Sequence, residues 1–259
     1  MSTTTLSLSP THSKRFPAGL LFLFLLRLPP LGPAFPAAAA EISEADFARL
    51  REEMVERDLR SRGVRDERVL DAMRSVPRHR FVPEEHRPAA YQDRPLPIAG
   101  GQTISQPYIV ALMSGLLELK GGEKVLEIGA GSGYQAAVLS RLAAEVYTIE
   151  IIPSLAATAK ETLARLGYRN ISVKAGDGFF GWEEKAPFDA ILITAAAATI
   201  PDPLWRQLRE QGRLVMPLGE PRREQRLVRV RKLGGKPQIE TVTAVIFVPM
   251  TGAIQQPER

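Results

Sequence analysis

From Lys124 onward, short runs rich in β-branched and aromatic residues alternate with stretches of helical character. The helical stretches include Tyr134–Leu142 and Ser154–Leu166. The strand-like runs are Lys124–Ile128, Glu145–Ile149, Ile171–Lys174, Phe188–Thr194 and Arg213–Leu218. Strands joined by helices at this spacing run parallel to one another. The pattern therefore predicts an α/β fold, a Rossmann-like doubly wound sheet with helices on both faces.

Two further β-rich runs follow this alternation. Arg226–Lys232 and Gln238–Val248 flank Gly234-Gly235, a dipeptide typical of a tight hairpin. We expect them to form an antiparallel C-terminal pair that completes a mostly parallel, seven-stranded sheet. Residues 121–259 would then form the Rossmann-like core.

The segment ahead of this core is helical in pattern and contains one long loop. Apolar residues recur at helical spacing over Ser43–Arg60, and Asp66–Ser75 and Pro107–Leu119 are further predicted helices. Pro83–Gly101 is rich in Pro and Gly and is expected to be a loop with a function. Residues 41–120 would thus supply N-terminal helices and a substrate loop.

Met1–Ala40 differs in composition from the single domain expected over residues 41–259. Lys14 and Arg15 precede an apolar run from Phe16 to Leu26, and small residues end the segment. This layout is typical of a signal peptide, although a disordered extension or a start assigned too far upstream would also fit. The apolar run is shorter than the roughly 20 residues that cross a bilayer. We therefore expect no stable membrane association.

The charge balance argues against nucleic acid as a partner. Lys and Arg total 34 against 29 Asp and Glu, which gives a net charge of +5. Three of these positive charges lie in Met1–Ala40, where there is no acid, so Glu41–Arg259 carries only +2. The chain has no Cys and three His, so we expect no metal site and no Ser–His nucleophile.

The strongest local motif is Val125–Tyr134, an apolar strand followed by a glycine-rich turn and the start of a helix. The glycines are Gly129, Gly131 and Gly133. Glycine lets the backbone bend sharply and lets a ligand approach it without a Cβ in between. In the dinucleotide pattern the third glycine would stand at position 134, where this chain has Tyr134. The motif therefore favours a nucleotide-like ligand other than a dinucleotide.

Acidic residues follow three successive predicted strands. Glu127 lies at the end of the first, Glu150 ends the second and Asp177-Gly178 follows the third. Each acid alone could be a solvated strand end, but ligands of open α/β sheets bind outside the carboxyl ends of the strands. Glu127 suits the positive amino end of S-adenosylmethionine, Glu150 the two ribose hydroxyls and Asp177 the adenine amino group. The loop and the acids together predict an S-adenosylmethionine site.

Two stretches bear on the second substrate. Gln102–Pro107 lies just ahead of a predicted helix, where free N–H groups and the hydroxyls of Thr103 and Ser105 could bind a carboxylate. Ser105 or Gln106 could instead only cap that helix. Thr194–Ala198 either leaves space without supplying a base or starts a helix of good helix formers.

Further motifs extend from about Val55 to about Thr251. They are Val76-Pro77-Arg78, Phe81-Val82-Pro83, Leu96-Pro97-Ile98, Thr103-Ile104-Ser105-Gln106-Pro107, Val125–Tyr134, Gly176-Asp177-Gly178, Ala186–Ala190, Ile193–Ala196 and Phe247-Val248-Pro249. Together they resemble the protein-L-isoaspartate O-methyltransferases, a family of class I S-adenosylmethionine-dependent methyltransferases. The glycine turn would fit any class I methyltransferase, whereas the motifs at 103–107 and 186–190 are more specific.

This resemblance implies methyl esterification of the free α-carboxyl of L-isoaspartyl residues in damaged proteins and peptides, which initiates repair through a succinimide. It implies that Ser105 is the active-site residue; because a carboxylate is ionised at neutral pH, we expect Ser105 to position it rather than to act as a nucleophile. The expected cofactor-binding residues are Thr103, Glu127, Gly129, Gly131, Gly133, Glu150, Asp177 and Gly178. The expected substrate-binding residues are Ile104, Ser105, Gln106 and Thr194.

The resemblance also implies isoaspartyl-containing partners, and we expect a monomer that acts in the cytoplasm. Export is the alternative if Met1–Ala40 is a working signal peptide. Two other functions stay open at this point: a class I methyltransferase for a small molecule or RNA, and a binding module that kept the fold without catalysis.

Overall fold

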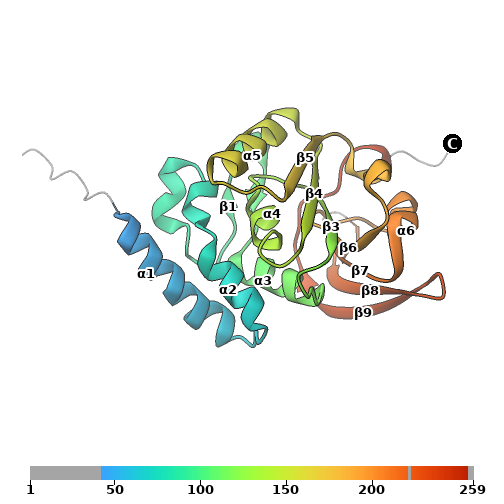
Figure 1. Ribbon diagram of the computed structural model, residues 1–259, viewed down its shortest axis with the longest axis horizontal. Coiled ribbons are helices and arrows are strands. Elements are labelled where there is room, and N and C mark those ends of the chain that lie inside the picture. Colours follow the sequence, from blue (N-terminus) through green and yellow to red (C-terminus); the bar gives the residue numbers. More distant parts are fainter. Residues whose placement is uncertain (1–41, 221–222, 256–259) are drawn as a thin grey trace, which may run out of the picture. The chain divides into compact units, whose positions relative to one another are not determined.

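The computed structural model describes residues 42–220 and 223–255, and its main feature is a seven-stranded sheet (Figure 1). The strands are β3 (Lys124–Ile128), β4 (Glu145–Glu150), β5 (Ile171–Ala175), β6 (Phe188–Ile193), β7 (Leu208–Leu218), β8 (Gln225–Leu233) and β9 (Lys236–Val245). The predictions made for Met1–Ala40 lie outside the described residues.

The strand order is β5-β4-β3-β6-β7-β8-β9. The pairs from β5 to β7 are parallel, and β8 and β9 add antiparallel pairs at the end, so the predicted mixed sheet is confirmed. The chain runs from β3 outward to β5 and then crosses back to place β6 on the other side of β3. In open α/β sheets such a reversal between neighbouring strands marks where ligands bind.

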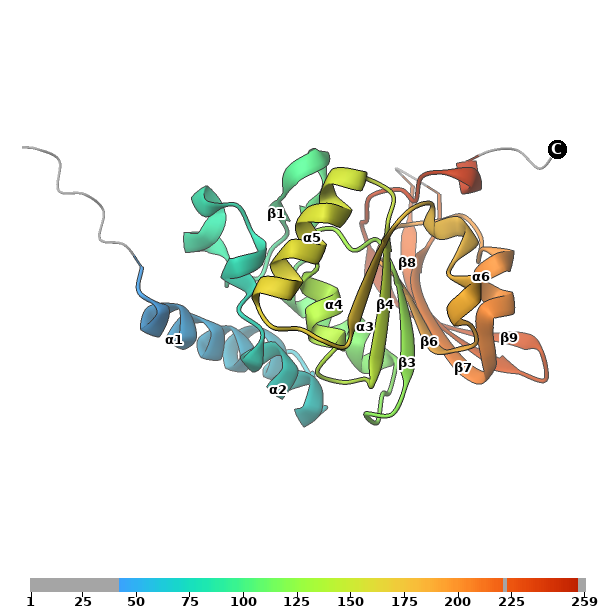
Figure 2. The same ribbon diagram turned by 45° about the horizontal axis from the view of Figure 1, so that its top comes forward.

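Helices cover both faces of the sheet (Figure 2). The helices of the domain are α1 (Glu44–Met54), α2 (Glu67–Ser75), α3 (Pro107–Leu116), α4 (Tyr134–Leu139), α5 (Pro153–Arg165) and α6 (Asp202–Gln207). Figure 2 shows α3, α4 and α5 on one face and α6 on the other. Alternate side chains of β3 enter two separate cores. Val125 belongs to the core with α3, α4 and α5, and Leu126 belongs to the core with α6. Burial on both faces explains why the parallel strands read as almost continuous apolar runs.

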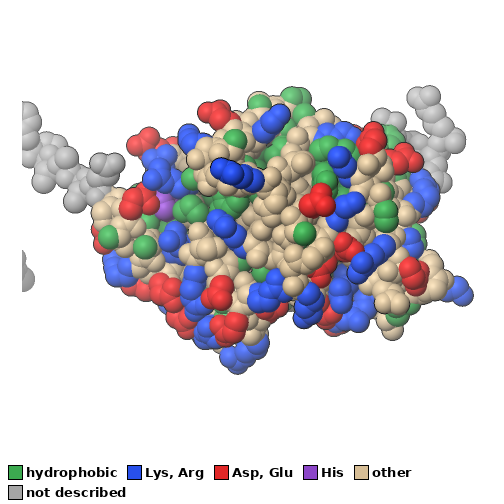
Figure 3. Space-filling view, viewed as in Figure 1, with side chains coloured by type: hydrophobic (Ala, Val, Ile, Leu, Met, Phe, Trp, Pro, Cys, Tyr) green, Lys and Arg blue, Asp and Glu red, His purple; other side chains and the backbone are tan. Residues whose placement is uncertain are grey.

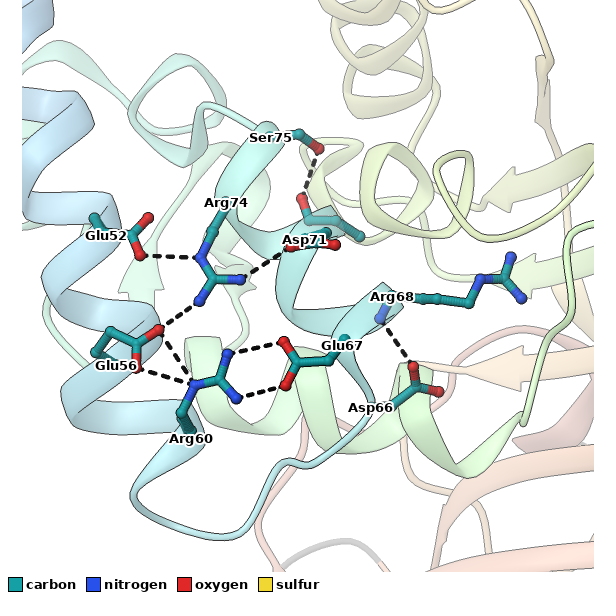
Figure 4. Close-up of polar contacts among 10 residues, drawn as sticks. Glu52, Glu56, Arg60, Asp66, Glu67, Arg68, Asp71, Arg74 and Ser75 are labelled. Carbon is teal, nitrogen blue, oxygen red and sulfur yellow. Dashed lines mark hydrogen bonds and ion pairs between the residues drawn. The ribbon is translucent and has the colours of Figure 1, made fainter.

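The predicted N-terminal helices form, with one irregularity. The helix begun at Glu44 continues after Met54 as a π-helical segment, Val55–Arg60. Figure 4 shows how α2 is joined to this long helix by arginines that each bind more than one acid. Arg60 bridges Glu56 and Glu67, and Arg74 bridges Glu52, Glu56 and Asp71. A network of this kind fixes the register of two helices better than isolated surface pairs do.

Two details of the fold differ from the sequence-based expectations. Pro83–Gly101 is not wholly irregular, because it contains β1 (Leu96–Pro97), which pairs antiparallel with β2 (Thr103–Ile104). The helix considered for Thr194–Ala198 is wrong. Its backbone is tied by isolated bridges from Ala196 and Ala197 to distant residues, and α6 begins only at Asp202.

The surface of the described chain carries both charge signs. Figure 3 shows Lys and Arg side chains interleaved with Asp and Glu on the face in view. Of the helices that the structure describes, none is long and apolar enough to cross a membrane.

Candidate functional site

A crevice of about 320 Å³ opens at the carboxyl ends of β3, β4 and β6. We call it the glycine crevice. Most of its lining comes from five segments: Gly101–Ser105, Ile128–Ser132, Ile149–Ile152, Thr194-Ala195 and Val248–Thr251. It therefore lies at the reversal of strand order between β3 and β6, where the sequence pattern predicted a ligand.

The glycine turn is held in place by the end of β4. The N–H groups of Gly129 and Ala130 both point to the carbonyl of Ile149, at 2.8 and 3.2 Å. Gly129 has a positive φ of 95°, and a Cβ at this position would overlap the hydroxyl of Thr194. Gly133 caps α4 in the left-handed conformation and does not line the crevice. Gly129 and Gly131 thus form the wall, and Gly133 shapes the turn behind it.

Glu150 is the acid that faces the glycine crevice. Its side chain is almost fully buried, and its Oε2 accepts the Gly131 N–H at 2.8 Å while Oε1 accepts the Ile152 N–H at 3.0 Å. Each oxygen keeps a further lone pair for a ligand. Glu150 can therefore fix the glycine turn and accept hydrogen bonds from a bound molecule at the same time.

Glu127 lies below the crevice rather than in its lining. Its side chain is completely buried, and neither carboxylate oxygen has a hydrogen-bond partner among the described residues. Burial raises the pKa of Glu127 to about 8, because a charged carboxylate without partners is costly in the interior. A buried carboxyl group left in this state is suited to receive a cationic ligand.

Asp177 is engaged within the protein. Its Oδ1 accepts the Phe179 N–H at 2.9 Å, and its Oδ2 accepts the Ala253 N–H at 2.7 Å. The neighbouring Gly178 lines the crevice, but Asp177 does not. In this structure Asp177 therefore holds the C-terminal segment in place, and the expected contact with an adenine stays a prediction.

A second cavity of about 650 Å³ adjoins the first, and we call it the apolar groove. Its lining is Pro95, Thr103, Ser105, Gln106, Ile109, Thr194 and Ala244–Val248. Four residues line both cavities: Thr103, Ser105, Thr194 and Val248. The hydroxyl of Thr194 lies 2.8 Å from the carbonyl oxygen of Gly129, so it also joins the groove to the glycine turn. The structure thus brings the predicted catalytic Ser105 to the junction of two cavities.

The cap of α3 comes from a residue that the sequence patterns missed. Asp93 accepts the Tyr108 N–H at 2.9 Å and the Gln106 side-chain amide at 2.8 Å, and it also pairs with Arg62. Gln106 makes no side-chain cap of its own. Among the described residues no hydrogen bond occupies the Ser105 hydroxyl, so Ser105 is available to a ligand. No short-range signal could identify Asp93, because it stands 15 residues before Tyr108 in the chain.

The C-terminal segment is the other contribution that spacing could not reveal. Val248–Thr251 closes one side of the glycine crevice, and Ala196 ties it down through hydrogen bonds with Val248 and Met250. Ile104 is buried and also lines the crevice, beside the exposed Thr103. Among the described residues no group of three His, Cys, Asp or Glu side chains could hold a metal ion.

A family model described as protein-L-isoaspartate(D-aspartate) O-methyltransferase (PCMT) matches residues 49–255. The chain is 54% identical over 234 residues to protein-L-isoaspartate O-methyltransferase 2 of Shewanella sediminis (strain HAW-EB3), covering 90% of this chain and 95% of that protein. It is 56% identical over 201 residues to protein-L-isoaspartate O-methyltransferase of Opitutus terrae (strain DSM 11246 / JCM 15787 / PB90-1), covering 78% and 86% of the two chains.

Two solved structures are similar over most of the described chain. One, described as a protein-L-isoaspartate O-methyltransferase, has a TM-score of 0.71 at 30% identity and covers 79% of this chain and 67% of that one. The other, a Plasmodium falciparum protein described as a β-aspartate methyltransferase (PCMT) in complex with S-adenosyl-L-homocysteine, has a TM-score of 0.67 at 26% identity and covers 78% and 98%.

Proposed function

Because the chain belongs to the protein-L-isoaspartate(D-aspartate) O-methyltransferase family, we propose that it transfers the methyl group of S-adenosylmethionine to the free α-carboxylate of L-isoaspartyl residues in damaged proteins and peptides. The methyl ester then closes to a succinimide without further catalysis, and this starts the repair.

The residues of the glycine crevice suit S-adenosylmethionine. Glu150 lines the crevice and offers free lone pairs to ribose hydroxyls. Glu127 has a buried carboxyl group without a partner but lies outside the lining, so its contact with the positive end of the ligand stays a prediction. At Gly129 the backbone packs against the Thr194 hydroxyl more closely than a Cβ would allow, which keeps the glycine turn in place along the crevice. The crevice is also lined by Thr103, Gly131 and Gly178. Gly133 shapes the turn behind it as the cap of α4.

The cofactor supplies an activated methyl group on a sulfonium sulfur. The acceptor carboxylate is already ionised at neutral pH, so the protein needs no general base. Ser105 donates a hydrogen bond that orients the acceptor oxygen, and the buried Ile104 excludes water beside it. Thr194 and Gln106 shape the acceptor side without taking a proton. Holding the reactants in line can contribute about 7–11 kcal/mol to such a reaction.

The observation that carries this proposal is the junction of the two cavities. A methyl transfer needs a donor site and an acceptor site that meet at one point, and Ser105 lies where the glycine crevice and the apolar groove share their walls. The exposed hydroxyl of Thr103 lies at the same junction.

The proposal is tested with radiolabelled S-adenosylmethionine and two peptides that differ only in carrying isoaspartate or aspartate. Base-labile label on the isoaspartyl peptide alone supports the proposal. Label on RNA and on neither peptide would favour a different methyltransferase. Label on no acceptor, with S-adenosylhomocysteine still bound, would indicate a binding module.

Ser105→Ala tests the role of the hydroxyl. Removal of one hydrogen bond to a charged group costs about 1.5–3 kcal/mol, so methyl transfer should fall roughly 10- to 100-fold. The dissociation constant for S-adenosylhomocysteine, measured by calorimetry, should stay nearly unchanged. An equal loss in both quantities would contradict a role in positioning the acceptor.

The proposed enzyme acts as a monomer in the cytoplasm, where its methyl donor is made, and it does not use nucleic acid as a substrate. The charge balance supports the last point, because Glu41–Arg259 carries only +2 and nucleic-acid-binding domains are strongly basic. On the face in view in Figure 3, Lys and Arg are interleaved with Asp and Glu. N-terminal sequencing of the native protein tests the alternative of export through Met1–Ala40.

A further inference from the structure

The apolar groove has walls without charge directly beside Ser105. Apart from the polar residues near the junction, it is lined by Pro95, Ile109 and Ala244–Val248. None of its lining residues, all of which the structure describes, is Asp, Glu, Lys, Arg or His. A charged side chain entering this space would lose water without gaining a partner, whereas an apolar side chain would gain by leaving water.

Ile246 at the rim of this groove is exposed to an unusual degree. Its side chain is 95% exposed, more than that of any other large hydrophobic residue in the described chain. A single exposed apolar side chain is ordinary on a protein surface. This one differs because it belongs to the wall of a cavity that adjoins the proposed acceptor position.

The backbone around Ile246 is fixed, so its exposure is imposed by the fold. Gln225 is buried, and its side-chain amide binds Phe247 twice: it accepts the Phe247 N–H at 2.7 Å and donates to the Phe247 carbonyl at 3.2 Å. On the other side, Val245 pairs with Gln225 at the end of β9. Ala196 then holds Val248 by a backbone bond of 2.8 Å. The backbone at Ile246 is therefore held in place, and its side chain has no packing partner in the part of the chain that the structure describes.

The proposed function supplies a reason for such a residue, and the inference rests on it. An isoaspartyl residue is part of a polypeptide that continues on both sides of the reacting carboxylate. When that carboxylate lies at Ser105, a neighbouring residue of the substrate must occupy the adjoining space. We propose that the apolar groove binds an apolar side chain next to the isoaspartyl residue, and that Ile246 is a specificity-determining residue in contact with that side chain.

The test compares peptides in which the residue beside isoaspartate is either Leu or Asp. One pair changes the preceding residue and a second pair changes the following residue. The enzymes are the full-length wild type, Ile246→Ser and Ile239→Ser. Ile239 is the matched control, because it is half-exposed on the neighbouring β9 but does not line the groove.

In at least one pair the wild type should prefer Leu over Asp in kcat/KM by roughly tenfold, the scale of burying part of one apolar side chain. Ile246→Ser should reduce this preference to about threefold or less, through a higher KM for the Leu peptide. Its melting temperature and its affinity for S-adenosylhomocysteine should stay at the wild-type values. Ile239→Ser should keep the full preference.

A preference that survives unchanged in Ile246→Ser would overturn the inference, and so would a wild type that treats Leu and Asp peptides alike in both pairs. In those cases the wild type still methylates isoaspartyl peptides, so the proposed function stands. A wild type that methylates none of the four peptides would overturn the proposed function and this inference with it.

Discussion

The glycine crevice and the apolar groove are adjacent, yet the fold builds them in different ways. The crevice is made by the turns that follow neighbouring parallel strands, and its main bonds join the ends of β3 and β4, as between Gly131 and Glu150. The groove joins Pro95 and Ile109 to Ala244–Val248, segments far apart in the chain. The strand-end part of the crevice thus follows from a repeated local pattern, although Val248–Thr251 closes it from a distant part of the chain, whereas the groove consists mainly of segments that meet only in the folded protein.

Their chemistry differs in the same way. The crevice presents one acid, Glu150, whose two oxygens are held by backbone N–H groups, and this fixed geometry suits a ligand of one shape. The groove presents apolar walls with one exposed side chain, Ile246, which suits a class of side chains rather than a single molecule. An enzyme that uses one methyl donor and many damaged proteins needs this combination.

The largest effect is expected from a substitution that disturbs the glycine crevice alone and weakens the binding of S-adenosylhomocysteine. Glu150→Ala removes the acceptor of two backbone N–H groups together with the proposed partner of the ribose. Hydrogen bonds to a charged group contribute about 1.5–3 kcal/mol each, so the dissociation constant for S-adenosylhomocysteine should rise at least about 100-fold. Isothermal titration calorimetry measures this directly.

Glu161→Ala is the matched control, since Glu161 is an exposed glutamate on the nearby helix α5. It should bind S-adenosylhomocysteine like the wild type. If Glu150→Ala also kept wild-type affinity, the crevice would not be held together by this carboxylate.

The next effect concerns Glu127, whose carboxyl group is buried without a partner. Burial raises its pKa to about 8 in the folded protein, well above the value of an exposed glutamate. Between about pH 4.5 and 8 the folded state therefore holds a proton that the unfolded state has released, and the free energy of unfolding falls as the pH rises. The slope of one such group reaches about 1.4 kcal/mol per pH unit.

Glu127→Gln should remove this component of the slope, because the amide has a similar shape and does not titrate. Urea unfolding of the ligand-free proteins at pH 6 and pH 8 measures it. The variant should gain stability relative to the wild type at pH 8, by about 2 kcal/mol more than at pH 6. Equal slopes in the two proteins would show that Glu127 is ionised at neutral pH.

The same contrast explains which parts of the protein could be predicted from the sequence. The strands β3 to β6, the glycine turn and the position of Glu150 follow from local patterns, because hydrophobic periodicity and glycine spacing act over a few residues. The motif at Thr103–Gln106 contains Ser105, which lines the crevice in the structure, and its catalytic role stays a prediction.

The unpredicted parts all depend on contacts between distant residues. Glu127 and Asp177 occupy the expected strand ends, but whether a strand-end acid faces a ligand or the interior depends on the packing above it. The cap that Asp93 gives to α3 and the support that Gln225 gives to Phe247 join separate segments. The alanines after Thr194 resemble a helix start by propensity, yet bridges to Leu218 and Pro249 determine their conformation.

The smallest effect is expected from a substitution that disturbs the acceptor side alone and lowers kcat/KM. Asp93→Asn keeps an oxygen for the Tyr108 N–H but turns an amide toward Arg62 and the Gln106 amide, which are themselves donors. Gln106 and its neighbour Ser105 should lose part of their positioning, so kcat/KM for an isoaspartyl peptide should fall about fivefold, or about 1 kcal/mol.

Because Asp93 lines neither cavity, its replacement should leave the affinity for S-adenosylhomocysteine unchanged. Arg94→Ala is the control, as Arg94 is exposed and binds only Gln92 among the described side chains. A loss of cofactor affinity in Asp93→Asn would mean that the two cavities are mechanically coupled through α3. A loss confined to kcat/KM would show that the acceptor side can be disturbed while the donor side keeps its shape.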